Sequence, residues 1–156
     1  MIEAGAPGFE ILAPPVGVSE GLALLQAPKG TITFFYYQDL GDAAAFYRDV
    51  IGLRSVMESD WCVIFDLNPG ARLGLVNATA GSQRPILGRN KGAILSLQID
   101  DVEACLERLK RQGLAPASAC LAEGCAGRTR EYKIQDPEGY TVEFFAWVDQ
   151  QAAYST

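Results

Sequence analysis

The stretch Thr31–Leu53, TITFFYYQDLGDAAAFYRDVIGL, decides the fold of this chain. β-Branched and aromatic residues fill its first part, Thr31–Tyr37, and predict a strand. Asp39 and Asp42 follow as candidate N-caps of a helix. Apolar side chains then recur with helical spacing, and Gly52 is placed to end the helix. The stretch therefore predicts a strand that leads directly into an amphipathic helix.

Three more strands are predicted after this helix, at 54–58, 61–67 and 71–76. Asn68-Pro69-Gly70 is a hairpin turn between the last two. The next segment, ATAGSQRPILGRNK at 78–91, is rich in turn formers and shows little periodicity. It indicates a linker.

The same order of elements begins again after the linker. Gly92–Ile99 predicts a strand, and Asp100 with Glu103 fits a capping box at the start of a second amphipathic helix. Gly113 is placed to end that helix. Strands are then expected near 115–119, 129–135 and 141–147.

The two halves form a degenerate internal repeat. Asp39 matches Asp101 at an offset of 62 residues, and Gly52-Leu53 matches Gly113-Leu114 at an offset of 61. One strand-helix-strand-strand-strand unit cannot close a core, whereas two units can curl into a cup. We therefore predict an α+β fold in which two βαβββ modules form a cupped mixed sheet. The expected divisions are an arm at 1–29, modules at 30–77 and 92–148, the linker at 78–91 and a tail at 149–156.

Three stretches carry a family resemblance: FFYYQDLGDAAAFYRDVIGL, SLQIDDVEACLERLKRQGL and KIQDPEGYTVEFF. They resemble the vicinal oxygen chelate superfamily, which includes glyoxalase, bleomycin-resistance and extradiol-dioxygenase proteins. The resemblance implies the two-module fold and, in metal-dependent members, an ion held inside the cup. It says little about activity, because this fold hosts many unrelated functions.

The metal positions implied by the resemblance hold few donors in this chain. Ile32 and Ile94 occupy two positions where metal-dependent members carry histidine or a similar ligand. The fourth position falls near 75–77, where Asn77 is the only donor, and Glu143 is the one ligand retained. The chain has no histidine, and its four cysteines form no Cys-x-x-Cys pair. We expect no metal and no other cofactor.

Strand alternation assigns side chains to the inside of the cup. The predicted lining is mostly apolar with a few polar anchors, which is typical of a pocket for an organic molecule. The predicted ligand-binding residues are Ile32, Phe34, Tyr36, Ile94, Ser96, Gln98, Thr141, Glu143 and Phe145.

Two of these residues are candidate catalytic groups. Glu143, surrounded by isoleucine and phenylalanine, is expected to have a raised pKa, as a general base working near neutrality needs. The alternative is a carboxylate that only forms hydrogen bonds within the sheet. Tyr36 is a candidate acid or hydroxyl anchor, with simple packing as the alternative.

Charge and hydropathy exclude several kinds of partner. A net charge of −6 and a pI of about 4.6 argue against nucleic acid or an anionic membrane surface. No apolar run approaches the ~20 residues of a membrane span. The N-terminus lacks the pattern of a secretory signal, so we expect a cytoplasmic protein.

The favoured function is metal-independent binding of a small organic ligand, as in the antibiotic-sequestering branch that the chain resembles. The alternative is a metal-free lyase, isomerase or cyclase that uses Glu143 as a base, so whether the chain is an enzyme stays open. The missing ligands disfavour a metal-dependent glyoxalase or dioxygenase. The resemblance and the apolar arm lead us to expect a homodimer.

Overall fold

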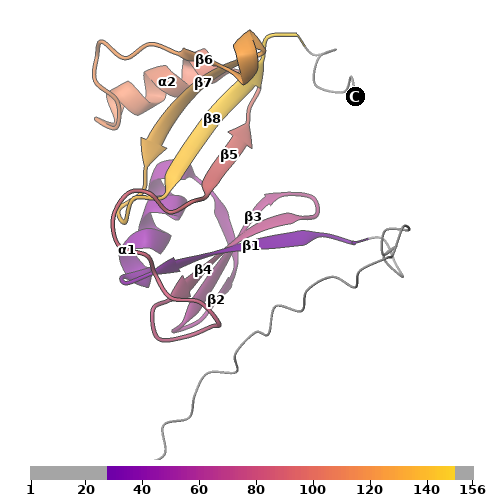
Figure 1. Cartoon of the computed structure of the whole chain (residues 1–156), viewed down its shortest axis with the longest axis vertical. Helices are drawn as coiled ribbons and strands as arrows, with labels where there is room; N and C mark the ends of the chain where they lie inside the picture. The colour runs from indigo at the N-terminus through magenta and orange to yellow at the C-terminus, as the bar shows by residue number, and fades with distance from the viewer. Residues whose placement is uncertain (1–27, 150–156) are drawn as a thin grey trace, which may run out of the picture.

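The computed structural model describes residues 28–149, and the predicted arm and tail lie almost wholly outside this range. Within it, the predicted order of strand, helix and three strands occurs twice (Figure 1). The α+β fold of two βαβββ modules is confirmed, and the strands form two four-stranded sheets. None of the helices between residues 28 and 149 is long and apolar enough to cross a bilayer.

The first module is a four-stranded mixed sheet with a helix on one face (Figure 1). Its order is β1 (Thr31–Tyr37), β4 (Ala71–Asn77), β3 (Cys62–Asn68) and β2 (Arg54–Glu58). β1 and β4 are parallel, and the other pairs are antiparallel. Between β1 and β2, α1 (Leu40–Ala45) runs directly into a π-helical segment, η1 (Phe46–Ile51).

Both ends of this helix follow the expected signals. The Asp39 carboxylate accepts a hydrogen bond from the Asp42 N–H at 2.9 Å, which satisfies a free donor of the first turn. At the other end Gly52 takes the left-handed conformation, with φ at 88°, and closes the helix.

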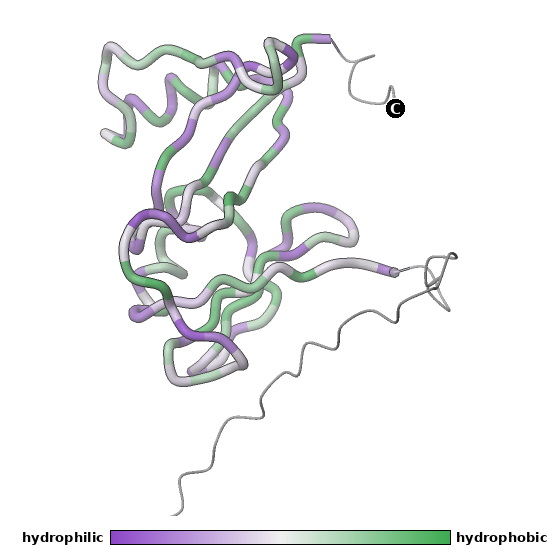
Figure 2. Tube along the Cα trace, viewed as in Figure 1, coloured by the Kyte–Doolittle hydropathy of each residue, from purple (hydrophilic) through white to green (hydrophobic). Residues whose placement is uncertain are grey.

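The second module repeats this arrangement. Its sheet order is β5 (Ile94–Gln98), β8 (Thr141–Trp147), β7 (Thr129–Gln135) and β6 (Ala122–Gly124). The helix α2 (Val102–Arg111) follows β5, and a short 3₁₀ turn, η2 (Cys125–Gly127), joins β6 to β7. In Figure 2, hydrophilic residues are spread along β7, whereas β4 in the first module is mostly apolar.

Two local predictions for the second module are wrong. No strand forms at 115–119, where Pro116 and three alanines make a turn, and the edge strand starts only at Ala122. The helix cap is Asp101 and not Asp100, because the Asp101 carboxylate accepts from the Ala104 N–H at 2.8 Å. No glutamate then stands three residues on, so the capping box does not form.

Each sheet turns alternate side chains toward the helices and the others toward its open face, meaning the face away from the helices. Phe35 and Tyr37 of β1 are buried in the core beneath the helix, as are Val142 and Phe144 of β8. One core cluster contains residues of both modules, so the modules pair within a single chain.

The loop between β7 and β8 holds the modules together. Asp136 caps its own turn by accepting from the N–H groups of Glu138 and Tyr140 at 3.0 and 2.8 Å. Its other oxygen accepts from the hydroxyls of Tyr37 and Tyr47 of the first module, at 2.7 and 3.1 Å. Because Asp136 is only 5% exposed, this carboxylate is a buried polar link between the two halves.

Two further contacts strengthen the same junction. The Tyr140 ring stacks on Phe35 with centroids 4.2 Å apart. The Glu138 carboxylate accepts from the backbone N–H groups of Gln38 and Asp39, at 2.9 and 2.7 Å. The turn of Asp136–Gly139 thus packs against the point where β1 passes into α1.

Candidate functional site

The predicted ligand-binding residues all lie on the open faces of the two sheets. On β1, Ile32 and Phe34 are 40% and 45% exposed, while Tyr36 is partly buried. The second sheet carries the other six on neighbouring strands, because three residues of β5 are in register with three of β8. These pairs are Ile94 with Thr141, Ser96 with Glu143, and Gln98 with Phe145.

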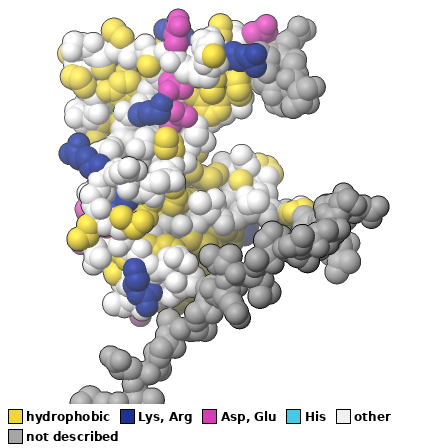
Figure 3. All heavy atoms as spheres, in the orientation of Figure 1, with side chains coloured by type: hydrophobic (Ala, Val, Ile, Leu, Met, Phe, Trp, Pro, Cys, Tyr) yellow, Lys and Arg dark blue, Asp and Glu magenta, His cyan; other side chains and the backbone are white. Residues whose placement is uncertain are grey.

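Figure 3 shows a hollow between the two modules, with hydrophobic side chains beside it. The strands nearest to it are β1 and β5, which are the edge strands of their sheets. We refer below to this hollow, together with the open faces of the two sheets, as the recess. The open face of the first sheet exposes the apolar side chains of Ile32 and Phe34, and the open face of the second sheet carries most of the polar groups.

Glu143 has closer partners than the sequence suggested. Ser96 Oγ donates to its carboxylate at 2.5 Å, and Lys133 Nζ forms an ion pair with it at 2.7 Å. Lys133 also forms an ion pair with Glu131 of the same strand. The charged side chains of Glu131, Lys133 and Glu143 form a row across β7 and β8 on the open face of the second sheet.

The expected rise in the pKa of Glu143 is wrong. Burial alone would raise the pKa of this carboxyl, but hydrogen bonds from Lys133 and Ser96 and the lysine charge bring it below its usual value. The missed residue is Lys133. Alternation along TREYKIQ placed it on the same face as Glu131, but its contact with Glu143 depends on the register between β7 and β8.

Tyr36 contacts Tyr140 through its backbone and lies close to the linker through its ring. Its backbone N–H donates to Tyr140 Oη at 3.2 Å, and that hydroxyl donates in turn to the Tyr36 carbonyl at 3.3 Å. A Cβ added to Gly81 of the linker would lie 2.9 Å from the Tyr36 ring. The linker therefore covers this end of β1, and the ring lies beneath it.

The internal repeat locates the fourth metal position at Gly74. Ser96 is in register with Glu143, and Phe34, 62 residues before Ser96, is in register with Gly74. The predicted location at 75–77 is therefore wrong. Leu75 is fully buried in the core, and the Asn77 side chain accepts from the N–H and hydroxyl of Thr79.

These residues do not fit a metal ion. The four equivalent positions hold Ile32, Gly74, Ile94 and Glu143, and the single carboxylate among them is already paired with a lysine. A Cβ at Gly74 would lie 2.4 Å from the Phe34 ring, so the ring lies where a ligand side chain would extend. Across residues 28–149, no three acidic or cysteine side chains are grouped as a metal site would require.

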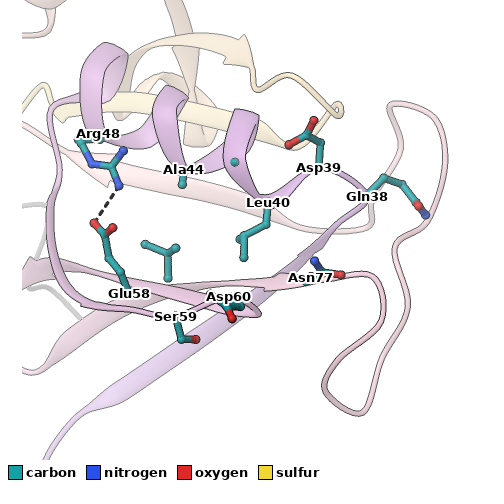
Figure 4. A pocket seen from close by; sticks show the side chains of 11 residues that line it. Gln38, Asp39, Leu40, Ala44, Arg48, Glu58, Ser59, Asp60 and Asn77 are labelled. Carbon is teal, nitrogen blue, oxygen red and sulfur yellow. Dashed lines mark hydrogen bonds and ion pairs between the residues drawn. The ribbon is translucent and has the colours of Figure 1, made fainter.

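A polar pocket of about 440 Å³ lies apart from the recess, between α1 and the β2–β3 turn (Figure 4). Its charged groups largely serve local structure. Arg48 pairs with Glu58 at 2.8 Å, and Asp39 caps the helix. Leu40 and Ala44 of α1 form its apolar side. The pocket brings together none of the residues predicted to bind a ligand.

Comparison with known proteins gives a family and a set of similar folds. The model of the Glyoxalase/Bleomycin resistance protein/Dioxygenase superfamily matches residues 31–144. A search of curated proteins finds no match.

Among solved structures, a lactoylglutathione lyase from Agrobacterium tumefaciens is 24% identical, with a TM-score of 0.60 over 74% of this chain and 90% of that one. A glyoxalase/bleomycin resistance protein/dioxygenase from Nocardioides is 19% identical, with a TM-score of 0.63 over 81% and 88%. An integron cassette protein from V. cholerae is 16% identical, with a TM-score of 0.59 over 80% and 98%. Because all three identities are below 25%, the similarity shows a shared fold and does not extend to a shared activity.

Proposed function

Since this chain belongs to the Glyoxalase/Bleomycin resistance protein/Dioxygenase superfamily, we propose that it binds a small organic molecule in the recess without a metal ion. The observation that carries the proposal is the identity of the four equivalent positions on the open faces. Isoleucine, glycine and isoleucine stand beside one ion-paired glutamate. A site of this chemistry favours contact with an organic surface over coordination of a metal.

The two walls of the recess suit a ligand with one apolar face and one polar edge. Ile32 and Phe34 expose apolar surface on the first sheet, and burying it against a ligand is favourable by about 25 cal/mol per Å². On the second sheet Ser96, Gln98 and the Lys133–Glu143 pair supply donors and acceptors. These polar groups would fix the orientation of the ligand, as the few anchors of an apolar site do.

The ion pair favours binding over proton abstraction. A general base that works near neutrality needs a pKa close to 7, and the partners of Glu143 move its pKa in the opposite direction. Lys133 is 43% exposed and Glu143 is 15% exposed, so a ligand can reach the pair from the solvent side. We therefore assign Glu143 the role of an anchor.

The proposal is tested by ligand-observed NMR with a library of small organic molecules, before and after treatment with a chelator. We expect hits whose affinity is unchanged by the chelator and whose binding shifts the signals of Phe34 and Glu143. Phe34→Ala should weaken these hits, whereas Leu87→Ala, which removes an exposed apolar side chain from the linker, should not. One equivalent of tightly held zinc, iron, nickel or manganese in the purified protein contradicts the metal-free part of the proposal.

Binding and catalysis are separated with Glu143→Gln. If a bound compound is converted by the wild type and not by Glu143→Gln, the anchor role is wrong and the residue is a base. If neither protein converts any bound compound, the binding function stands.

A further inference from the structure

The two modules meet along two seams, and in each seam a loop of one module lies at the strand–helix junction of the other. The internal repeat makes the two seams equivalent, but only the first is filled by side chains. In the first seam, the loop after β7 inserts against the junction of β1 and α1. Tyr140 stacks there on Phe35, and Asp136 bonds to Tyr37. By the same symmetry, the second seam lies where the loop after β3 meets the junction of β5 and α2.

The loop after β3 lacks the residues that fill the first seam. Ile32 is in register with Arg72, and Ile94 with Thr141, so Ala71 stands in the first module where Tyr140 stands in the second. The two connections have the same length, because five residues separate Asp66 from its partner Arg72 and five separate Gln135 from its partner Thr141, so the difference lies in the residue type. No aromatic ring is therefore available at this position to close the second seam.

A cavity of about 450 Å³ remains along the second seam. Both modules supply apolar walls, and most of these side chains are only partly buried although they pack against the core. The apolar walls include Ile51, Leu53 and Leu67 of the first module and Leu97, Ile99 and Phe144 of the second. The volume and the apolar lining fall within the range of small-molecule sites, roughly 300–1,000 Å³.

Most of this cavity lies on the other face of the second sheet from the recess, and Gln98, at the end of β5, is the residue that the two share. Leu97 and Phe144 point to the helix side of the second sheet, whereas Ser96 and Glu143, the adjacent residues on the same strands, point to the open face. A ligand in the seam and a ligand in the recess would therefore lie on opposite faces of β5 and β8.

One cation stands at the rim of the seam cavity. Arg108 of α2 lines it and donates one N–H to the Val50 carbonyl at 2.9 Å. A guanidinium has five N–H donors in a planar fork, which matches a carboxylate. The acidic residue at the same rim, Asp101, accepts from the backbone at the start of α2. Arg108 is thus the group placed to receive a charged ligand.

We propose that the seam cavity binds a small aromatic carboxylate, with the ring between Leu97, Leu67 and Phe144 and the carboxylate at Arg108. In the second seam, the ring of the ligand occupies the volume equivalent to the one that the Tyr140 ring fills in the first seam. The ligand contacts both modules, so it also stabilises their packing against each other.

The test uses naphthalene-2-carboxylate as the probe and naphthalene-2-carboxamide as a neutral control of the same shape. In ¹H–¹⁵N NMR titrations of the whole chain, we expect saturable shifts at Leu97, Ile99 and Ala104 with the carboxylate. The carboxamide should bind about tenfold more weakly, since hydrogen bonds to a charged partner are the stronger ones. Equal affinities, or shifts confined to Phe34 and Glu143, overturn the proposal.

Two variants of α2 test the role of the cation. Arg108→Gln should weaken binding of the carboxylate about tenfold. Arg111→Gln, which removes an exposed arginine from the same helix without touching the cavity, should leave binding unchanged. If the two variants bind the probe equally well, the assignment of Arg108 is wrong.

Two further measurements do not depend on the arginine. Ala104→Leu adds volume to the cavity wall at a position where leucine is a good helix former, so it should abolish binding and retain the fold. In the wild type, the probe should slow alkylation of Cys105, which lines the cavity, but not of exposed Cys120. No protection of Cys105 and no saturable shift up to the solubility limit of the probe refute the site.

Discussion

Replacing Asp136 by asparagine should weaken the contact between the two modules and lower the stability of the fold, because this buried carboxylate accepts four hydrogen bonds. One oxygen serves the N–H groups of its own turn, and the other serves the hydroxyls of Tyr37 and Tyr47 in the first module. An asparagine side chain has only one acceptor oxygen, so its NH₂ group must face one of the two donor pairs.

The size of the effect follows from this geometry. If the asparagine oxygen keeps the turn, the two bonds from tyrosine lose their charged acceptor, and each such bond is worth about 1.5–3 kcal/mol. The hydroxyls can rotate and accept from the new NH₂ group, which recovers part of the loss. We therefore expect Asp136→Asn to lower the free energy of unfolding by about 2–3 kcal/mol, and Asp136→Ala by about 3–5 kcal/mol.

A double-mutant cycle assigns the loss to the contact between modules. Tyr37→Phe removes the 2.7 Å bond to Asp136. Its cost should be about 1–2 kcal/mol smaller in the Asp136→Asn background than in the wild type. Urea unfolding followed by circular dichroism and by tyrosine fluorescence gives the four free energies. Asp49→Asn, an exposed position on the same helix as Tyr47, is the control and should change stability by less than about 0.5 kcal/mol.

Either of two results contradicts this role of Asp136. Asp136→Asn could match the surface control, in which case the buried carboxylate contributes nothing to stability. Alternatively the cycle could give additive effects, in which case Tyr37 and Asp136 do not interact across the modules.

Burial holds the pKa values of Tyr37 and Tyr47 above their usual value of 10.0. The Tyr47 hydroxyl and the Asp136 carboxylate raise the pKa of Tyr37 further, and Asp136 also raises the pKa of Tyr47. Unfolded tyrosine ionises near pH 10 and the buried rings do not, so the free energy of unfolding should fall above about pH 10, by about 1.4 kcal/mol per pH unit for each ring. Urea titrations across this range should show a smaller slope for Tyr37→Phe, and an unchanged slope contradicts the burial argument. Gly74→Ala should cost about 1–2 kcal/mol, because its Cβ would lie 2.4 Å from the Phe34 ring. Phe34→Ala in the same chain should restore most of that loss in thermal unfolding, and no restoration means that the strain lies elsewhere. Burial raises the pKa of Glu143, but its lysine and serine partners outweigh burial and leave the pKa below 4.5. Its contribution to stability is therefore present above pH 4.5 and lost as pH falls, so Glu143→Gln should flatten the acid side of the stability profile. An unaltered acid profile argues against the ion pair.

Much of the fold follows from local patterns. Alternation along β1 predicted which side chains face the helices, and Phe35 and Tyr37 are indeed buried there. The cap at Asp39 and the stop at Gly52 also lie where the residue types placed them. These features depend on neighbours in sequence, and strand and helix periods are properties of the backbone alone. The wrong strand at 115–119 shows the limit, since apolar alanines around a proline support a turn equally well.

The candidate site was predictable only in part. The open-face positions of Ile32, Ile94 and Glu143 follow from strand alternation, and the loss of metal ligands was visible in the residue types. Ligand binding in the recess and the homodimer stay predictions. The pairing of Glu143 with Lys133 and the metal-equivalent position of Gly74 required the registers between strands.

The sequence by itself determined the repeat, the faces of the strands and the absence of histidine from the cup. Only the tertiary structure decided that Asp136 joins the modules, that Lys133 forms an ion pair with Glu143 and that one seam is left with a cavity. The reason is that backbone periodicity acts over a few residues. Ion pairs, buried carboxylates and unfilled volume arise between segments about ten to a hundred residues apart, where the packing of whole elements sets the distance.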